Sequence, residues 1–306
     1  MKFPQIGLVA KPIKHQVTAT GFIEESLKRA GYRTRATLDL KASESIIFCW
    51  SWGKAETIRL GNKNAIICCL DHGYTRERGK FINTGWSVPS VPCGLNGFAE
   101  HAWVEDGGGR LRAMGWDAEL LLFPPAFKFH PQSQGLRALI CGQVYGDAMV
   151  VDHVADYTVW LHNLKDALQK EGYETRFRPH PVMVRRGNAR ERYGNMGRES
   201  QAKDLWEDFR VADLVVGLSS NAVAQGFMAG VDARVYNKGS MLSPLVTEFG
   251  HNIPREGRAE WAHRLAWTQW TEDELRDGTW ARHHIPIMHR LVEGGELRPW
   301  CERKLP

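Results

Sequence analysis

Apolar strand-like runs alternate with helix-like segments along most of the chain, and this alternation restricts the possible folds more than any other feature. The strand-like runs lie at 5–10, 45–50, 65–70, 137–144, 173–179, 213–219 and 233–237. The helix-like segments lie at 18–32, 55–62, 156–172, 202–209 and 220–230. Continuous apolar strands separated by helices are typical of parallel sheets that are covered by helices on both faces. We therefore predict the α/β class.

Two irregular stretches divide this pattern. From about 73 to 118 the periodicity is lost among Gly, Pro, Asn and Trp, which predicts a functional loop with a hairpin at 104–112. Residues 119–135 contain three prolines and predict a linker. The predicted organisation is an N-terminal α/β domain, a C-terminal α/β domain and a helical segment that packs back on the N-terminal domain, at 1–130, 131–255 and 256–306.

The C-terminal part is rich in Trp, Arg and His. Its spacing predicts helix over 255–294, interrupted at Pro286. Trp261, Trp267 and Trp270 are expected to be core anchors, with stacking on a sugar or a base as the alternative.

Composition indicates an ordinary globular chain. Of its 306 residues, 43% are hydrophobic and 25% are charged, and the net charge of +5 is compatible with a polyanionic partner. The sequence has no apolar run of eighteen residues and no signal-peptide core, so we expect no membrane span and a cytoplasmic location. The six cysteines show no C-x-x-C spacing, and we expect buried thiols in a reducing compartment.

Several common cofactor and metal motifs are missing. The sequence has no G-x-x-x-x-G-K-[ST] loop, no G-x-G-x-x-G after the first strand, no H-E-x-x-H and no D-x-D pair. We therefore expect neither a metal ion nor a resident cofactor.

The segment DLVVGLSSNAVAQGFMAG joins an apolar strand to a helix through Ser219, Ser220 and Asn221. The free N–H groups at a helix start attract anions, and capping alone needs one such side chain rather than three. The turn therefore predicts an anion site. A serine nucleophile is the rival interpretation, although Asn221 breaks the G-x-S-x-G spacing.

The segment YETRFRPHPV ends a strand with His180 between two prolines. Proline fixes its own φ and keeps the preceding residue extended, so His180 is held rigidly at the edge of the sheet. Because the carboxyl ends of parallel strands share one edge, we expect Arg178 and His180 beside Ser219–Asn221, as a cradle for a diphosphate. Gln143 and Asp147 follow the neighbouring strand and are expected to line the same pocket.

Asp71 and His72 follow the apolar run 65–70. Adjacent side chains on a strand point to opposite sides, so we expect one of the two to act as the general base for an attacking hydroxyl. Arg76 and Arg78 are expected to contact an anionic substrate. The alternative is a turn with solvated arginines.

These segments together resemble a known family. WSWGKAETIRL, LICGQVYGDAMV, RFRPHP and VVGLSSNAVAQGFMAG resemble segments of the capsule-polysaccharide β-Kdo transferases. The CDP-glycerol glycerophosphotransferases share the H-G, K-P-H-P and D-Y-S-S elements in the same order. The resemblance covers residues 50–240. GYTRERGKF and the later G-L-N-G segment also resemble small phage-borne proteins.

This resemblance implies a metal-independent GT-B glycosyltransferase with two Rossmann-like domains. The N-terminal domain would bind the acceptor, and the C-terminal domain would bind a nucleotide-sugar donor such as a UDP-sugar. Gln225 stands where the family has a glutamate in the donor site, which leaves the donor nucleotide open. The family's E-D-G is D-H-G here, so the base is either Asp71 or His72.

The predicted acceptor is DNA that carries a hydroxymethylated pyrimidine, as in phage DNA hypermodification in the host cytoplasm. The alternative is a glycosyltransferase or polyol-phosphate transferase that acts on a surface or capsule glycan. A flipped base would stack on Trp86 or Trp103, with Asn96 of the G-L-N-G segment also contacting the acceptor. Two other classes stay open: a serine hydrolase built on Ser219, and a non-catalytic nucleic-acid-binding protein. The sequence shows no helix-turn-helix, RNP run or zinc finger that would favour the latter.

Overall fold

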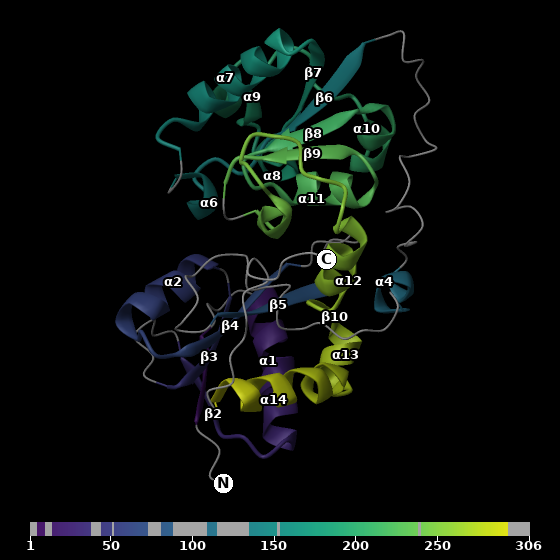
Figure 1. The fold of residues 1–306 in the computed structure, drawn as a ribbon. Coiled ribbons are helices and arrows are strands. Elements are labelled where there is room, and N and C mark those ends of the chain that lie inside the picture. Colours follow the sequence, from purple (N-terminus) through teal and green to yellow (C-terminus); the bar gives the residue numbers. More distant parts are fainter. Residues whose placement is uncertain are drawn as a thin grey trace. The chain divides into compact units, whose positions relative to one another are not determined.

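The computed structural model describes residues 5–9, 14–37, 44–50, 52–72, 81–87, 109–114, 135–151, 154–237 and 240–292. Within these ranges, the side chains not described are those of 14–16, 52, 53, 56, 71, 72, 81–87, 148, 149 and 290–292. The chain divides into two compact units, the first formed by Met1–Arg110 with His263–Pro306 and the second by Leu111–Ala262 (Figure 1). None of the described helices combines the length and the apolar character needed to cross a bilayer.

The first unit is a six-stranded sheet with helices on both faces (Figure 1). Its elements are β1 Ile6–Val9, α1 Lys14–Arg29, β2 Thr34–Thr37, β3 Ile46–Trp50, α2 Trp52–Gly61, β4 Ile66–His72, β5 Phe81–Ser87, β10 Gln269–Thr271, α13 Glu272–Arg276 and α14 Thr279–Val292. The strand order is β10-β5-β4-β3-β1-β2. Strands β2, β1, β3 and β4 run parallel, whereas β5 is antiparallel to both β4 and β10.

The two faces of this sheet have separate cores, because side chains alternate along each strand. Phe48 belongs to the cluster that α1, α13 and α14 cover, which includes Trp270 and Trp280. Cys49 belongs to the cluster on the other face, against Ile58 of α2. Strands buried on both faces are continuously apolar, which explains the uninterrupted run of β3.

The second unit has a four-stranded parallel sheet with the order β7-β6-β8-β9. Its elements are α4 Gly109–Ala113, which straddles the unit boundary, β6 Leu136–Cys141, α6 Ala148–Val151, α7 Tyr157–Lys170, β7 Tyr173–Arg178, α8 Pro181–Arg185, α9 Ala189–Tyr193, α10 Leu205–Val211, β8 Leu214–Gly217, α11 Asn221–Met228, β9 Asp232–Val235, the 3-10 turn η2 Ser243–Leu245 and α12 Arg258–Ala266, whose last residues belong to the first unit.

Helix α11 lies very close to this sheet because of Gly226. A Cβ atom at this position would lie 2.7 Å from Cγ1 of Val215 and 3.0 Å from the ring of Phe209, closer than such atoms approach in proteins. The Val215 face is thus covered by α10 and α11. The opposite face, which includes Val216, packs on Leu161 and the other apolar residues of α7.

The structure corrects four expectations. Residues 81–87, predicted to be irregular, form β5, and Gly109–Ala113 is helical where a hairpin was predicted. In α4 the side chain of Leu111 is buried, and burial of one face favours a helix over a glycine turn. The C-terminal part is not all helical, since Gln269–Thr271 pairs with β5. Pro286 does not interrupt α14, because it lies on the exposed side of the helix.

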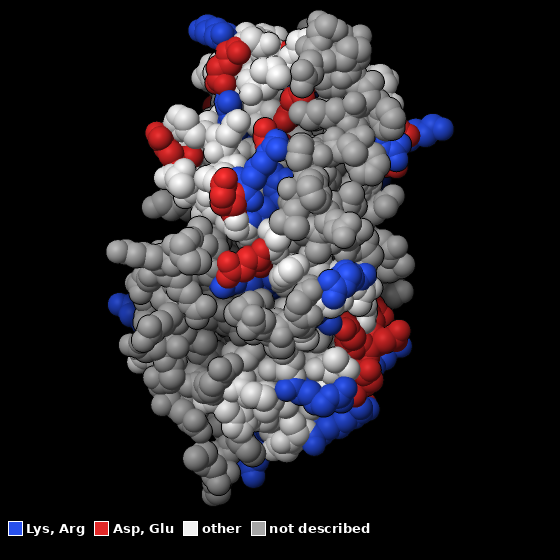
Figure 2. All heavy atoms as spheres, turned by 45° about the vertical axis from the view of Figure 1, so that its right-hand side comes forward, with Lys and Arg blue, Asp and Glu red and all other residues white. Residues whose placement is uncertain are grey.

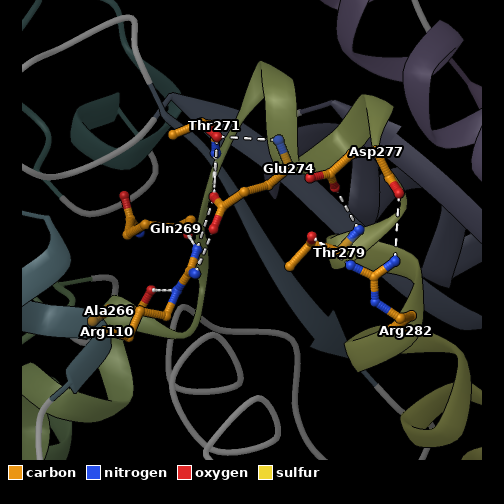
Figure 3. A network of polar contacts seen from close by, with 8 residues as sticks. All are labelled: Arg110, Ala266, Gln269, Thr271, Glu274, Asp277, Thr279 and Arg282. Carbon is orange, nitrogen blue, oxygen red and sulfur yellow. Dashed lines mark hydrogen bonds and ion pairs between the residues drawn. The ribbon is translucent and has the colours of Figure 1, made fainter.

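Two of the three tryptophans predicted to be core anchors, Trp261 and Trp270, are core residues, whereas Trp267 is half-buried. Trp261, Trp270 and Trp280 are each at most 1% exposed. Trp270 lies on a strand rather than on the predicted helix. Its ring and that of Trp267 stack with the Arg110 guanidinium, at 4.1 and 5.1 Å from the ring centroids, so Arg110 joins α4 to β10 and α13 in a single polar network (Figure 3).

Candidate functional site

Three adjacent parallel strands of the second unit end side by side. β6 is the central one, with β7 and β8 on either side. The chain after β6 stays paired, because the Gly142 N–H donates to the Arg178 carbonyl of β7 at 2.9 Å. A Cβ atom at Gly142 would lie 2.9 Å from the ring of Phe177, so glycine is required for this close approach. Polar residues that follow these strands are thereby brought to one edge.

The turn between β8 and α11 is tightly built. A Cβ atom at Gly217 would lie 3.0 Å from Val223 and 3.2 Å from the Cys141 carbonyl oxygen. Ser220 caps α11, since its Oγ accepts from the Ala222 N–H at 3.3 Å. Ser219 and Ser220 are buried, each 8% exposed, and the turn reaches the surface at the next residue, the exposed Asn221.

Gln143 and Ser219 form a reciprocal pair across this edge. The Ser219 N–H donates to Gln143 Oε1 at 2.8 Å, and Gln143 Nε2 donates to Ser219 Oγ at 3.0 Å. The structure thus brings together two residues that the sequence predicted at one site. The Gln143 side chain is thus held by the turn, and its place in a donor pocket stays a prediction.

Two tyrosine hydroxyls form hydrogen bonds with the backbone of Gln143. The Gln143 N–H donates to the Tyr157 hydroxyl at 3.0 Å, and the Tyr193 hydroxyl donates to the Gln143 carbonyl at 2.5 Å. Burial raises the pKa of Tyr157 strongly and that of Tyr193 to about 12, so both hydroxyls are neutral at physiological pH. The sequence offered no signal for these two tyrosines, because their spacing is that of ordinary core residues.

His180 begins α8, and this explains the two prolines beside it. Its φ and ψ of −66° and 134° are extended, and Pro181 is the first helical residue, where a missing N–H costs nothing. His180 Nδ1 accepts from the Val182 N–H at 3.2 Å. Since that nitrogen accepts, the neutral imidazole carries its hydrogen on Nε2.

Arg178 has a different partner from the one predicted. Its Nη1 donates to Asp208 of α10 at 2.5 Å and lies 3.3 Å from Ser200 Oγ. Asp208 is 1% exposed, and a buried carboxylate requires such a cation. Nη1 of Arg178 is therefore held by the ion pair, and contact of Arg178 with a phosphate stays a prediction.

The remaining predicted donor residues lie at the same edge or near it. Asp147 is exposed at the start of α6, and its carbonyl accepts from the Val150 N–H at 2.8 Å. Asn221 is the exposed first residue of α11, and Gln225 is half-buried one turn later. Contact with a donor stays a prediction for all three.

In the first unit, Asp71 and His72 are the last two residues of β4, as predicted. Their backbones pair with Asn83 and Ile82 of β5, and Trp86 of β5 pairs with Cys68. The side chains of Asp71, His72 and Trp86 are outside the description, so their roles stay predictions. The other predicted acceptor residues lie outside the described residues: Arg76, Arg78, Asn96 and Trp103.

A search of the described residues finds no group of three or more His, Cys, Asp and Glu side chains placed to hold a metal ion. Metal independence stays a prediction. A hollow of about 360 Å³, lined by Gln5, Arg35, Glu44 and Ser45, lies at the amino ends of the first unit's strands. Ligands of open parallel sheets bind at the carboxyl ends, so we do not assign the hollow to the candidate site.

Known proteins match this chain through structure alone. No protein-family model and no curated protein sequence matches it. Among solved structures, the beta Kdo 2,7 transferase KpsC of Thermosulfurimonas dismutans is similar, with a TM-score of 0.54, 13% identity, and coverage of 92% of this chain and 99% of that one.

The beta Kdo 2,4 transferase KpsC of the same organism has a TM-score of 0.56 and 16% identity, with coverage of 86% of this chain and 89% of that one. At such low identity, the similarity concerns the fold. The two Rossmann-like units therefore have the GT-B architecture of these β-Kdo transferases.

Proposed function

We propose that the protein is a glycosyltransferase that moves a sugar from a nucleotide-sugar donor to an acceptor hydroxyl, with the donor phosphate at the β6-β7-β8 edge. The observation that supports this most is the reciprocal pair of Gln143 and Ser219 beside the start of α11. Hydroxyls and a helix start at the carboxyl edge of a parallel sheet are suited to a phosphate. The same fold occurs in two solved β-Kdo transferases.

In the proposed reaction, a base takes the proton of the acceptor hydroxyl while its oxygen attacks the anomeric carbon of the donor. The bond from that carbon to the phosphate oxygen breaks, and the nucleotide leaves with the electron pair. Ser219, Ser220 and the Nε2–H of His180 would stabilise the negative charge that develops on the leaving phosphate. Asp71 or His72, at the end of β4, would be the base.

For the acceptor we propose a glycan hydroxyl, and an acidic glycan fits the surface charge best. Four exposed arginines lie on α8, at its C-cap and on α9, in the segment that follows His180, at positions 185, 186, 190 and 192. Among the described residues on the face shown in Figure 2, acidic and basic side chains are interspersed. The two solved proteins of similar fold are named as β-Kdo transferases.

The DNA acceptor predicted from the sequence has no support from these neighbours. Most of the residues predicted to contact it, such as Arg76 and Trp103, lie outside the described residues. It stays a prediction, which the acceptor assay below also tests.

The test combines donor binding with transfer. A panel of nucleoside mono- and diphosphates is titrated by calorimetry, and sugar nucleotides with the best base are incubated with acidic oligosaccharides or with hydroxymethylated duplex DNA. We expect sugar transfer to the oligosaccharide. His180→Ala should lower turnover by about 100- to 1,000-fold, as loss of a donor to a developing anion does. His251→Ala, at an exposed histidine of the same unit, is the control. If no nucleotide binds to the wild type, the proposal is wrong.

A further inference from the structure

The side chain of Gln143 can be oriented in only one way. Its Oε1 lies 2.8 Å from the Ser219 backbone nitrogen. A backbone N–H can only donate, so the atom that faces it must be the amide oxygen. The amide nitrogen therefore faces Ser219 Oγ at 3.0 Å. Because an amide –NH2 can only donate, Ser219 Oγ is the acceptor in this second bond.

This polarity leaves the hydroxyl hydrogen of Ser219 for another partner. A serine hydroxyl has one hydrogen and two lone pairs, and Gln143 occupies one lone pair. The Ser219 hydroxyl donates to no acceptor among the residues that the structure describes. Ser220 is similar, since its Oγ already accepts from the Ala222 N–H. Both hydroxyls thus offer hydrogens, which suits a ligand rich in acceptors.

We infer that Gln143 is a positioning residue that orients the Ser219 hydroxyl as a donor to a phosphate-bearing leaving group. This inference rests on the proposed function and assigns Gln143 no contact with the ligand. The residue cannot easily adjust, because it is 8% exposed and hydrogen bonds from or to Tyr157 and Tyr193 fix both polar groups of its backbone. The ring of Tyr193 packs in turn on Phe177, with centroids 5.0 Å apart.

Gln143→Glu tests this role, because it preserves the shape and reverses the polarity. One carboxylate oxygen can still accept from the Ser219 N–H, but the other cannot donate, so the Ser219 hydroxyl must donate to it. Its lone pairs would then face the ligand. We expect inorganic pyrophosphate to bind roughly 10- to 100-fold more weakly at alkaline pH, as for the loss of a hydrogen bond to a charged group.

The pH dependence of binding distinguishes a reversed hydrogen bond between residue 143 and Ser219 from a general distortion of the site. When the introduced carboxyl takes up a proton, it can again donate to Ser219 Oγ, so the ratio of variant to wild-type dissociation constants should fall toward one as the pH is lowered from about 8 to about 5. The ionisable groups around Gln143 are Tyr157, Tyr193, Cys141, His180, Asp147 and the Arg178–Asp208 pair. All of these groups are present in both proteins, and the titration of free pyrophosphate is the same for both and cancels in the ratio.

Two further variants complete the experiment. Gln169→Glu makes the same change beside another hydroxyl, that of Thr175, to which Gln169 Nε2 donates at 3.2 Å; it should bind pyrophosphate like the wild type. In a Ser219→Ala background there is no hydroxyl to reorient and only the repulsion between the introduced carboxylate and pyrophosphate remains, so Gln143→Glu should cost less there and recover less at low pH.

The outcomes distinguish this inference from the function on which it rests. Calorimetry with inorganic phosphate and pyrophosphate first establishes binding by the wild type, and its absence would overturn the proposed donor site itself. If the wild type binds but Gln143→Glu binds equally well, the positioning role is wrong and the site stands. Weakened binding with a pH-independent ratio would also overturn the role, because it would indicate a general distortion.

Discussion

Arg110→Ala should destabilise the first unit far more than the loss of an exposed ion pair. The Arg110 guanidinium donates to both oxygens of Glu274, at 2.6 and 3.1 Å, and to the Ala266 and Gln269 carbonyls (Figure 3). Glu274 in turn forms a capping box with Thr271 at the start of α13. One side chain thus connects α4, the end of α12, β10 and α13.

The expected magnitude follows from the burial of the pair. The side chain of Arg110 is 10% exposed and that of Glu274 is 25% exposed. Removing one partner of a fully buried pair costs about 3–5 kcal/mol, and partial access of water to Glu274 lowers this. We therefore expect Arg110→Ala to reduce the free energy of unfolding by about 3 kcal/mol, and Arg110→Lys by about half as much, because lysine keeps the charge but loses the two-pronged contact.

Urea denaturation followed by tryptophan fluorescence measures this change, since Trp267 and Trp270 lie against the Arg110 guanidinium. Arg29→Ala is the matched control, because the Arg29–Glu25 pair is 60% and 53% exposed and the hydrogen bond from Arg29 to the Arg276 carbonyl is exposed as well. Their loss should cost less than about 1 kcal/mol. Equal urea midpoints for Arg110→Ala and Arg29→Ala would refute the claim that the buried contacts of Arg110 stabilise the unit more than an exposed ion pair.

The pH dependence gives a second test of the same contact. Burial alone would raise the pKa of Glu274, but hydrogen bonds from Arg110 and from the Thr271 N–H outweigh it and leave the pKa below 4.5. A carboxyl whose folded-state pKa is lowered stabilises above its unfolded pKa, and this contribution is lost as the pH falls through the folded value. The difference in the free energy of unfolding between wild type and Arg110→Ala should therefore become smaller as the pH is lowered.

Three further predictions concern buried residues. Burial and nearby positive charge hold the pKa of His284 well below 6.5. Below pH 6.5 the unfolded chain takes up a proton and the folded chain does not, so the free energy of unfolding should fall by up to about 1.4 kcal/mol per pH unit. In His284→Phe, thermal melts should show a smaller fall in stability with pH. Gly226→Ala should cost about 1–3 kcal/mol in urea, because its Cβ would lie 2.7 Å from Val215. Arg258 is 1% exposed and lies over the Phe227 ring, and its Nε and Nη2 have no hydrogen-bond partner among the described residues. The melting temperature of Arg258→Met should therefore equal or exceed that of the wild type. A markedly lower melting temperature would show that the charge is stabilising.

The sequence was most informative where burial on both faces made a strand continuously apolar. The runs of β3, β6 and β8 were identified for this reason, and the positions between them had helical spacing. β10, an edge strand, was missed together with its neighbour β5, because their pairing joins residues 186 positions apart, Gln269 with Asn83. Such a partner leaves no local pattern.

The candidate site was predicted in part for a similar reason. Chain order fixes which residues follow parallel strands, so the sequence could place Gln143 and Ser219 at one edge. It could not predict that Arg178 pairs with Asp208, because that choice depends on how α10 packs beside β7. Tyr157 and Tyr193 were missed because a tyrosine that supports a site and one that fills a core occupy the same apolar positions.

The types of the residues at the β6-β7-β8 edge could not show which class of ligand binds there. Hydroxyl, amide and imidazole groups both donate and accept, so a list of such groups fits a neutral sugar as well as a phosphate. The direction of donation is decided by partners that do not touch the ligand: Gln143 makes Ser219 a donor, and the Val182 N–H fixes the hydrogen of His180 on Nε2. Substitutions of residues that orient the ligand-contacting groups, such as Gln143, should therefore change which ligands bind without removing any group that contacts the ligand.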